Sequence, residues 1–286
     1  MKPRTWLCAT LLLTLSPSAA PTAKDREVVW PDHLRVVYLP ADGREAVLRR
    51  FAPFNEYLGR MLGLEVEPIS FDTYSEVIAF LSAGRFELAY LGPSTYSQAM
   101  NWLHLRALAM ELDLEGRRGY YSLIICRPDR TEKSFADFSG RVFAFSSPES
   151  TSGFLVPLQH FLSQLKITPG MFAERVEFAG NHREVALGVL SGRYDSGVVA
   201  SIDLERVFME RPEARKLRAL WQSELLPGSL FCSHPDLPEG LAAAAEAVIC
   251  NYGIDPARSR GLGVGGYVPA TEADYLAMRV LESFRP

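Results

Sequence analysis

The 286-residue sequence has no basic excess, no internal repeat and no low-complexity segment. Thirty Lys and Arg residues against 34 Asp and Glu residues give a formal net charge of −4 at pH 7, whereas nucleic-acid-binding surfaces normally carry an excess of positive charge. Outside residues 6–15, no apolar run is long enough to suggest a membrane span. We therefore expect neither a nucleic-acid-binding protein nor a mature chain that crosses a bilayer.

Several motifs with specific chemistry are also absent. The sequence has no Gly-x4-Gly-Lys-Ser/Thr loop and no pair of histidines at helical spacing, so it predicts no nucleotide, metal or other cofactor. It has no Gly-x-Ser-x-Gly elbow, and no carboxylate is placed along the chain to orient His182 as a catalytic base. Cys126 and Cys232 have no histidine nearby in sequence to activate a thiolate. We expect no enzymatic activity.

Residues 1–23 have the order of a cleavable secretory signal. Two cationic residues precede the apolar run at 6–15, which is too short to span a bilayer, and small residues follow it. We expect cleavage near Ala20 or Ala23, which leaves three cysteines. Cys250 lies on the apolar side of a predicted helix, where a cysteine packs as a small apolar residue. The sequence leaves open whether Cys126 and Cys232 form a disulfide or remain free thiols.

Strand-like apolar runs alternate with amphipathic stretches along most of the chain, which predicts mostly parallel, doubly wound α/β sheets. The pattern restarts after residue 119, so we expect two lobes of five strands each rather than one large sheet. Strands are predicted at residues 34–39, 64–69, 87–91, 120–126, 142–145, 176–178, 196–200, 217–221 and 229–233. Helices are predicted at residues 45–62, 74–82, 153–165, 183–191, 203–210 and 241–252.

The most informative segment is Ser150-Thr151-Ser152-Gly153, which follows the predicted strand at 142–145 and opens a helix. Hydroxyl side chains satisfy the unpaired N–H groups of a first helical turn, but three in a row exceed what capping requires. The same helix N-terminus can hold an anion without a cationic side chain. Gly153 would let a ligand approach the backbone closely. From spacing alone, a plain cap and an anion site fit these residues equally well.

Two other turns follow predicted strands in the same way. Ser94 and Thr95 come after the strand at 87–91, and His182 comes after the strand at 176–178. In doubly wound sheets, ligands collect beyond the carboxyl ends of the strands, where these turns lie. His182 could donate a hydrogen bond to an oxyanion, with charge assistance at lower pH. A surface histidine without a role is the alternative.

Residues 150–157, STSGFLVP, resemble a segment of the phosphate/phosphite/phosphonate-binding family of ABC-transporter periplasmic proteins. Other segments resemble this family too, namely residues 71–75, 90–93, 119–124, 182–195 and 251–253. The resemblance therefore spans residues 34–275, almost the whole mature chain.

The resemblance implies a type II periplasmic-binding fold, in which two doubly wound lobes are joined by a two-strand hinge. We expect one lobe at residues 33–121 plus 233–286 and the other at residues 122–232. It also implies a periplasmic protein with a cleft for a small phosphorus oxyanion. With the turns described above, the expected ligand-binding residues are Tyr74, Ser94, Thr95, Tyr120, Ser150, Thr151, Ser152 and His182.

The sequence departs from the family pattern at Ser229, where aminophosphonate binders have an acidic residue that receives the ligand ammonium. Two cations, Arg117 and Arg118, also precede the hinge segment. We therefore expect a simple oxyanion or a more anionic phosphonate to bind better than 2-aminoethylphosphonate. The alternative interpretation of Arg117 and Arg118 is a solvated loop pair.

The predicted function is capture and delivery. A monomeric protein would close on its ligand and present it to an ABC permease in the membrane. The alternative is a sensor whose closed form binds a membrane receptor kinase, because its ligand site would look the same.

Overall fold

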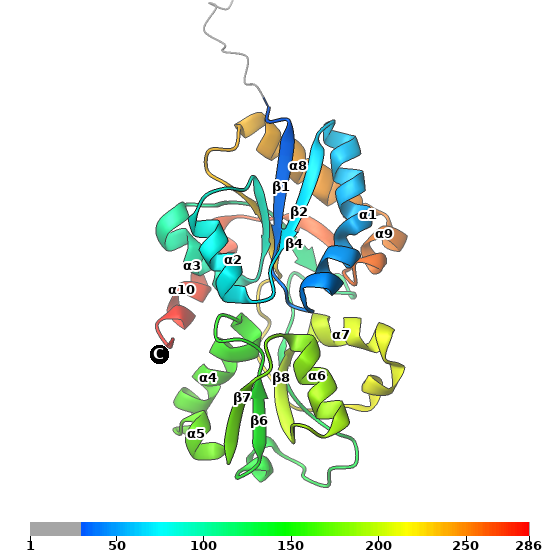
Figure 1. Cartoon of the computed structure of the whole chain (residues 1–286). Helices are drawn as coiled ribbons and strands as arrows, with labels where there is room; N and C mark the ends of the chain where they lie inside the picture. The colour runs from blue at the N-terminus through cyan, green and yellow to red at the C-terminus, as the bar shows by residue number, and fades with distance from the viewer. Residues whose placement is uncertain (1–29, 286) are drawn as a thin grey trace, which may run out of the picture. The chain divides into compact units, whose positions relative to one another are not determined.

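The computed structural model describes residues 30–285, and the predicted signal segment at 1–23 lies outside this range. Both lobes belong to one compact unit that begins at Pro31. Each lobe is built on its own sheet, one with blue, cyan and orange elements and one with green and yellow elements (Figure 1). No helix within the described range is long and apolar enough to cross a membrane.

Lobe 1 has a six-stranded sheet in the order β11-β4-β10-β3-β1-β2. Its strands are β1 (His33–Tyr38), β2 (Glu65–Ser70), β3 (Leu88–Leu91), β4 (Arg106–Leu112), β10 (Leu230–Ser233) and β11 (Gly266–Pro269). Its helices are α1 (Arg44–Leu62), α2 (Tyr74–Ser82), α3 (Pro93–Leu103), α8 (Glu239–Ile254), α9 (Pro256–Gly261), η5 (Glu272–Tyr275) and α10 (Leu276–Glu282). β1 runs parallel to β2 and β3, as the alternating pattern predicts.

Strand β1 explains why lobe 1 has helices on both faces of its sheet. Successive side chains of a strand point to opposite faces. Val36 and Tyr38 pack with Phe51 of α1 in one core cluster, whereas Val37 packs with Val77 of α2 in another. The carboxyl end of β1 points toward lobe 2 (Figure 1).

Lobe 2 has a five-stranded sheet in the order β7-β6-β8-β5-β9. Its strands are β5 (Ser122–Cys126), β6 (Val142–Phe145), β7 (Arg175–Phe178), β8 (Ser196–Ala200) and β9 (Arg218–Gln222). Its helical elements are η1 (Phe135–Phe138), η2 (Thr151–Leu155), α4 (Val156–His160), η3 (Phe161–Leu165), α5 (Pro169–Phe172), α6 (His182–Ser191), α7 (Ser201–Glu210) and η4 (Pro212–Lys216). The run from η2 to η3 is continuous, with π-helical turns at both ends.

Two segments connect the lobes, residues 113–121 and 223–229. They pair through an antiparallel bridge, in which the N–H of Tyr120 donates to Leu226 O at 3.0 Å and the N–H of Leu226 donates to Tyr120 O at 2.8 Å. This pairing is the two-strand hinge. The expected lobe boundary at residue 232 is misplaced, because Leu230–Ser233 pairs with β3 and β4 in the sheet of lobe 1.

The expectation of five strands in lobe 1 is wrong, because β4 and β11 were not predicted. β4 has the sequence RALAMEL, whose Ala, Leu, Met and Glu residues favour a helix in isolation. Its pairing with β10 and β11 overrides that preference. The disulfide alternative is also wrong, because Cys126 and Cys232 lie in different sheets and both are free thiols.

Candidate functional site

A small cavity of about 30 Å³ lies where the two lobes meet. Its walls come from the segments that follow β1, β2, β3, β6, β7 and β8, together with both hinge segments, so it occupies the carboxyl edges of both sheets. The lining residues are Leu39, Ala41, Tyr74, Gly92, Thr95, Tyr120, Ser150, Thr151, His182, Ile202, Asp203 and Ser229. Six of the eight residues expected at the site are therefore brought together here.

Ser150 caps the helical run and also faces the cavity. Its Oγ accepts a hydrogen bond from the N–H of Gly153 at 3.0 Å and lies 3.2 Å from Nε2 of His182. A hydroxyl can accept two hydrogen bonds and donate one. Because both contacts are made by donors, the O–H proton of Ser150 remains for a ligand oxygen.

The imidazole of His182 is held in one tautomer. Its Nδ1 accepts a hydrogen bond from the N–H of Ala200 at 3.1 Å, so Nε2 carries the proton in the neutral ring. Burial lowers the pKa of His182, against the opposing effect of Asp203, and Arg206 lowers it further. The site therefore contains a neutral N–H donor rather than the charge-assisted donor that the sequence suggested.

Gly153 makes room for protein groups rather than for a ligand. A Cβ atom at this position would lie 1.7 Å from Oγ of Ser146 and 2.8 Å from Cε1 of His182. Only glycine lets the imidazole pack this closely against the turn. The sequence analysis expected a ligand to approach Gly153, whereas the groups that approach it in the structure are Ser146 and His182.

Thr151 connects the lobes directly. Its Oγ1 accepts a hydrogen bond from the backbone N–H of Ser94 at 2.8 Å, which leaves its own proton for another acceptor. The Ser94 side chain does not line the cavity. Its Oγ instead bonds Glu282 and Arg285 near the C-terminus. Ser152 also lies outside the lining, and its buried Oγ has no hydrogen-bond partner among the described residues.

Tyr74 and Tyr120 are both buried and both line the cavity, as the family resemblance implied. The capping box of Thr73 and Glu76 fixes Tyr74 at the first position of α2. Tyr120 is fixed by the hinge bridge to Leu226. Burial raises the pKa of both phenols, so both remain protonated hydrogen-bond donors.

Sequence reasoning missed Asp203 and the buried network around it. Asp203 lines the cavity, and its Oδ1 accepts a hydrogen bond from Nη1 of Arg206 at 2.5 Å. Nη2 of Arg206 donates across the lobes to Oε2 of Glu111 at 3.3 Å. One signal was available: Asp203 follows β8 at the same sheet edge as the other turns.

The two arginines flagged in the sequence lie outside the cavity lining. Arg117 pairs with Asp113 and Glu115, and Arg118 pairs with Asp274. About half of each side chain is exposed, 47% for Arg117 and 51% for Arg118. The solvated-pair interpretation is therefore correct.

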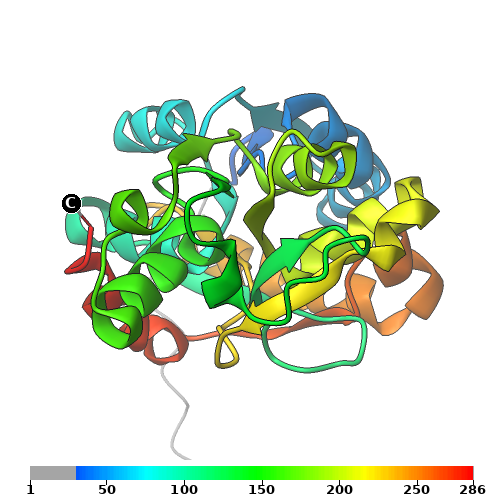
Figure 2. The ribbon, with the colours of Figure 1, turned by 90° about the horizontal axis from the view of Figure 1, so that it is seen from below.

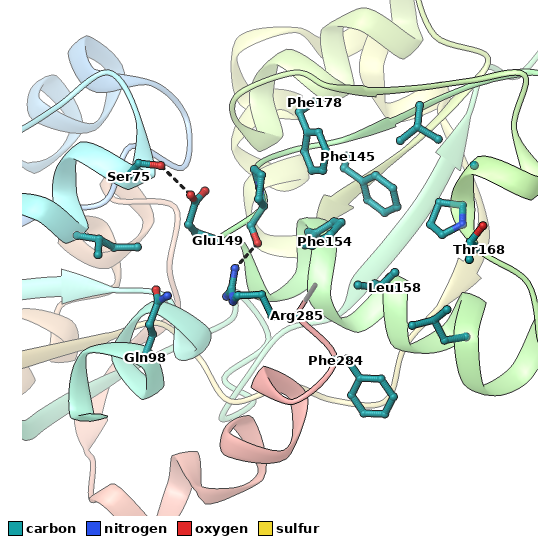
Figure 3. Close-up of a pocket in the computed structure, with 16 residues that line it drawn as sticks. Ser75, Gln98, Phe145, Glu149, Phe154, Leu158, Thr168, Phe178, Phe284 and Arg285 are labelled. Atoms are coloured by element: carbon teal, nitrogen blue, oxygen red, sulfur yellow. Dashed lines mark hydrogen bonds between the residues drawn. The ribbon is translucent and has the colours of Figure 1, made fainter. Parts of the chain in front are cut away.

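Two further contacts join the lobes beside a larger, mostly apolar cleft of about 900 Å³ (Figure 3). Oγ of Ser75 donates to Oε1 of Glu149 at 2.7 Å, and Nη1 of Arg285 donates to the carbonyl of Pro148 at 2.5 Å. Figures 1 and 2 both show the red C-terminal segment beside the green helical elements of lobe 2. The contacts of Ser75 and Arg285, together with those of Thr151 and Arg206, hold the lobes closed over the small cavity.

Comparison with known proteins identifies the family. A family model described as the periplasmic substrate-binding protein of a phosphonate ABC transporter matches residues 36–275. The chain belongs to this family. The phosphonate-binding family consists of transport binding proteins that work in the periplasm, and its members capture small phosphorus oxyanions for an ABC permease.

Similar members are known from several bacteria. The chain is 25% identical to the phosphate-import protein PhnD of Mycolicibacterium smegmatis, over 95% of this chain and 92% of that protein. It is 23% identical to the phosphonates-binding periplasmic protein of Escherichia coli, over 98% of this chain and 83% of that protein.

Solved structures of the phosphonate-binding family have the same fold. A binding component of a phosphonate ABC transporter from Pseudomonas aeruginosa superposes with a TM-score of 0.80 at 21% identity, covering 88% of this chain and 86% of the other. PhnD1 from Prochlorococcus marinus, in complex with methylphosphonate, gives a TM-score of 0.78 at 21% identity, covering 88% and 98%. The type II periplasmic-binding fold expected from the sequence is confirmed.

Proposed function

We propose that this protein binds a compact phosphorus oxyanion (phosphite, phosphate or methylphosphonate) through the hydroxyls of Ser150 and Thr151 and the phenols of Tyr74 and Tyr120, with the imidazole of His182 orienting the Ser150 hydroxyl toward the ligand. The observation that carries the proposal is the free hydroxyl proton on Ser150 and on Thr151, which in Ser150 depends on the hydrogen bond that its oxygen accepts from Nε2 of His182. The hydroxyl oxygens of Ser150 and Thr151 already accept hydrogen bonds from protein N–H groups, so their hydroxyl protons are available to a ligand. Buried donors without acceptors are costly, and an oxyanion supplies the acceptors.

The size of the cavity supports a compact ligand. A volume of about 30 Å³ corresponds to roughly two or three water molecules at ~10–15 Å³ each. A small tetrahedral oxyanion needs only slight widening of this space, whereas an aminoethyl arm needs the lobes to part. This extends the preference against 2-aminoethylphosphonate that the sequence suggested at Ser229.

Closure of the two lobes around the ligand would allow a membrane permease to distinguish the loaded protein from the empty one. The four interlobe contacts can form together only when the lobes meet, so the closed form presents a surface that the open form lacks. The protein acts as a monomer that hands its ligand to an ABC permease. Stimulation of the permease ATPase by ligand-loaded protein in lipid nanodiscs tests this step, and the absence of stimulation would favour the sensor alternative.

A thermal-shift panel tests the ligand class. Phosphite, phosphate and methylphosphonate should raise the melting temperature, because a ligand that binds only the folded state stabilises it. 2-Aminoethylphosphonate should raise it less. If none of these compounds shifts the transition, the proposed ligand class is wrong.

A further inference from the structure

Asp203 is the charged residue in the wall of the small cavity. Its side chain is almost fully buried, at 5% exposure. Arg206 occupies Oδ1, whereas Oδ2 accepts no hydrogen bond from the described residues and lies 3.8 Å from Nε2 of His182. A buried carboxylate oxygen without a donor is costly unless a ligand supplies one. Oδ2 is therefore a vacant acceptor at a site otherwise lined by donors.

The charges around Asp203 leave no positive side chain for the ligand. Three buried carboxylates face two guanidinium groups, so one negative charge is in excess, and His182 is neutral. The charged and titratable groups that interact directly with Asp203 are Arg206, His182, Tyr74 and Tyr120. Arg206 in turn interacts with Glu111, Tyr90 and Asp42, and Asp42 pairs with Arg50. A dianion bound here would add two like charges beside a carboxylate in a buried site, which is strongly unfavourable.

We infer that Oδ2 of Asp203 accepts a hydrogen bond from the P–O–H group of a singly protonated phosphorus oxyanion and thereby excludes sulfur oxyanions of the same shape. This inference rests on the proposed function and adds to it the protonation state of the ligand. The monoanion carries a P–O–H group that donates to Oδ2, while its other oxygens accept from the hydroxyls of Ser150 and Thr151. A sulfonate has no proton to donate, so its oxygen meets the carboxylate oxygen without a hydrogen between them.

Arg206 is the positioning residue for this contact. Its two nitrogens bond Oδ1 of Asp203 on its own helix and Oε2 of Glu111 in lobe 1. The guanidinium therefore fixes the carboxylate with one oxygen occupied and the other free. The same bonds tie α7 to lobe 1, so the acceptor is in place when the lobes are closed.

Calorimetric titration with a matched pair of ligands tests the inference. The methylphosphonate monoanion and methanesulfonate have the same shape and charge and differ by one proton. The wild-type protein should bind methylphosphonate at least roughly 100-fold more tightly than methanesulfonate, because a buried charged acceptor left unpaired is strongly disfavoured. Asp203→Asn should reduce this ratio by roughly tenfold or more, since its amide can donate to a sulfonate oxygen.

Glu205→Gln serves as the control, because Glu205 is another carboxylate on α7 that does not line the cavity. It should leave the ratio unchanged. Equal binding of both ligands by the wild-type protein overturns the inference but leaves the proposed function intact. If methylphosphonate, phosphite and phosphate all fail to bind, the proposed function itself fails.

A pH series on the wild-type protein keeps the test independent of whether Asp203→Asn folds. The affinity for methylphosphonate should fall as pH rises through the second pKa of the ligand, because the dianion has no proton for Asp203. A flat profile over that range overturns the inference. Tighter binding of 2-aminoethylphosphonate than of methylphosphonate also overturns it, because Asp203 would then serve an ammonium group.

Discussion

Ser94 of lobe 1 and Thr151 of lobe 2 are joined by a hydrogen bond in which the backbone N–H of Ser94 donates to Oγ1 of Thr151 at 2.8 Å. The bond consumes an acceptor site of the hydroxyl and leaves its proton to the cavity. The hydroxyl of Thr151 therefore contacts lobe 1 through its oxygen and can donate its proton to an anion in the cavity. Substitution of Thr151 should therefore affect both lobe closure and ligand binding, whereas substitution of a plain helix cap should affect only stability.

Thr151→Ala should weaken oxyanion binding by roughly 1.5–3 kcal/mol, because one donor to a charged ligand and one interlobe contact are lost together. Titration calorimetry measures the change. Thr168→Ala is the matched control, since Thr168 caps α5 by accepting from the N–H of Met171 away from the small cavity. The control should lower stability by about 1 kcal/mol and leave affinity unchanged. Equal losses of affinity in both variants would place the binding site elsewhere.

Gly153→Ala should weaken both folding and binding, because the new methyl group collides with Ser146 and the ring of His182. We expect a loss of stability of roughly 1–3 kcal/mol, in the range for an overpacked core. Gly170→Ala is the control, because nothing lies within 4 Å of a Cβ atom there. Chemical denaturation and calorimetry should show a change for the first variant alone; a harmless Gly153→Ala would mean that His182 is not fixed by this contact.

Arg285→Ala should shift the ligand-free protein toward an open form, because it removes the bond to Pro148 across the lobes. The affinity should fall only a few-fold, since an exposed contact contributes roughly 0–1 kcal/mol. Small-angle scattering should report a larger radius of gyration without ligand. Arg279→Ala removes an ion pair with Glu272 within lobe 1 and should leave the radius as in the wild type. Identical radii for both variants would exclude a role of Arg285 in closure.

The buried neutral state of His182 predicts a pH dependence of stability. Burial lowers the pKa of His182 in the folded protein, so below about pH 6.5 the unfolded chain binds a proton that the folded chain resists. The free energy of unfolding should therefore fall as pH drops from about 7 to 5. Burial lowers the pKa of His160 as well, so that residue contributes over the same range.

His182→Gln should flatten this slope by removing one of the two contributions, whereas His33→Gln, at an exposed position, should leave it unchanged. Urea denaturation at a series of pH values provides the measurement. An unchanged slope in His182→Gln would show that burial does not lower the pKa of His182 in the folded protein.

The sequence predicted the parts of the fold that depend on local pattern. Strand β6, strand β8 and helix α2 were predicted with the bounds that the structure has. Strand β4 was missed because its RALAMEL composition favours a helix, and its strand conformation is imposed by β10 and β11. Long-range pairing of this kind leaves no local signal in a single sequence.

The residues of the candidate site also fall into those that the sequence predicted and those that depend on long-range packing. Ser150, Thr151 and His182 could be named from the sequence because each follows a strand at a sheet edge. The orientation of Ser94 could not, because its hydroxyl is turned toward Glu282, 188 residues along the chain. Asp203 was passed over because an acidic residue in an amphipathic helix ordinarily faces solvent. In the structure Asp203 lies in the first turn of α7, directly after β8, and lines the cavity.

Titration calorimetry of methylphosphonate against the wild-type protein and the Ser150→Ala/Thr151→Ala double variant is the most direct test of the proposed oxyanion site. We predict one ligand per wild-type chain, and a loss of roughly 2–4 kcal/mol of binding free energy in the double variant, because two hydroxyl donors to the anion are removed. A double variant that folds and binds methylphosphonate with wild-type affinity would show that Ser150 and Thr151 do not bind the oxyanion.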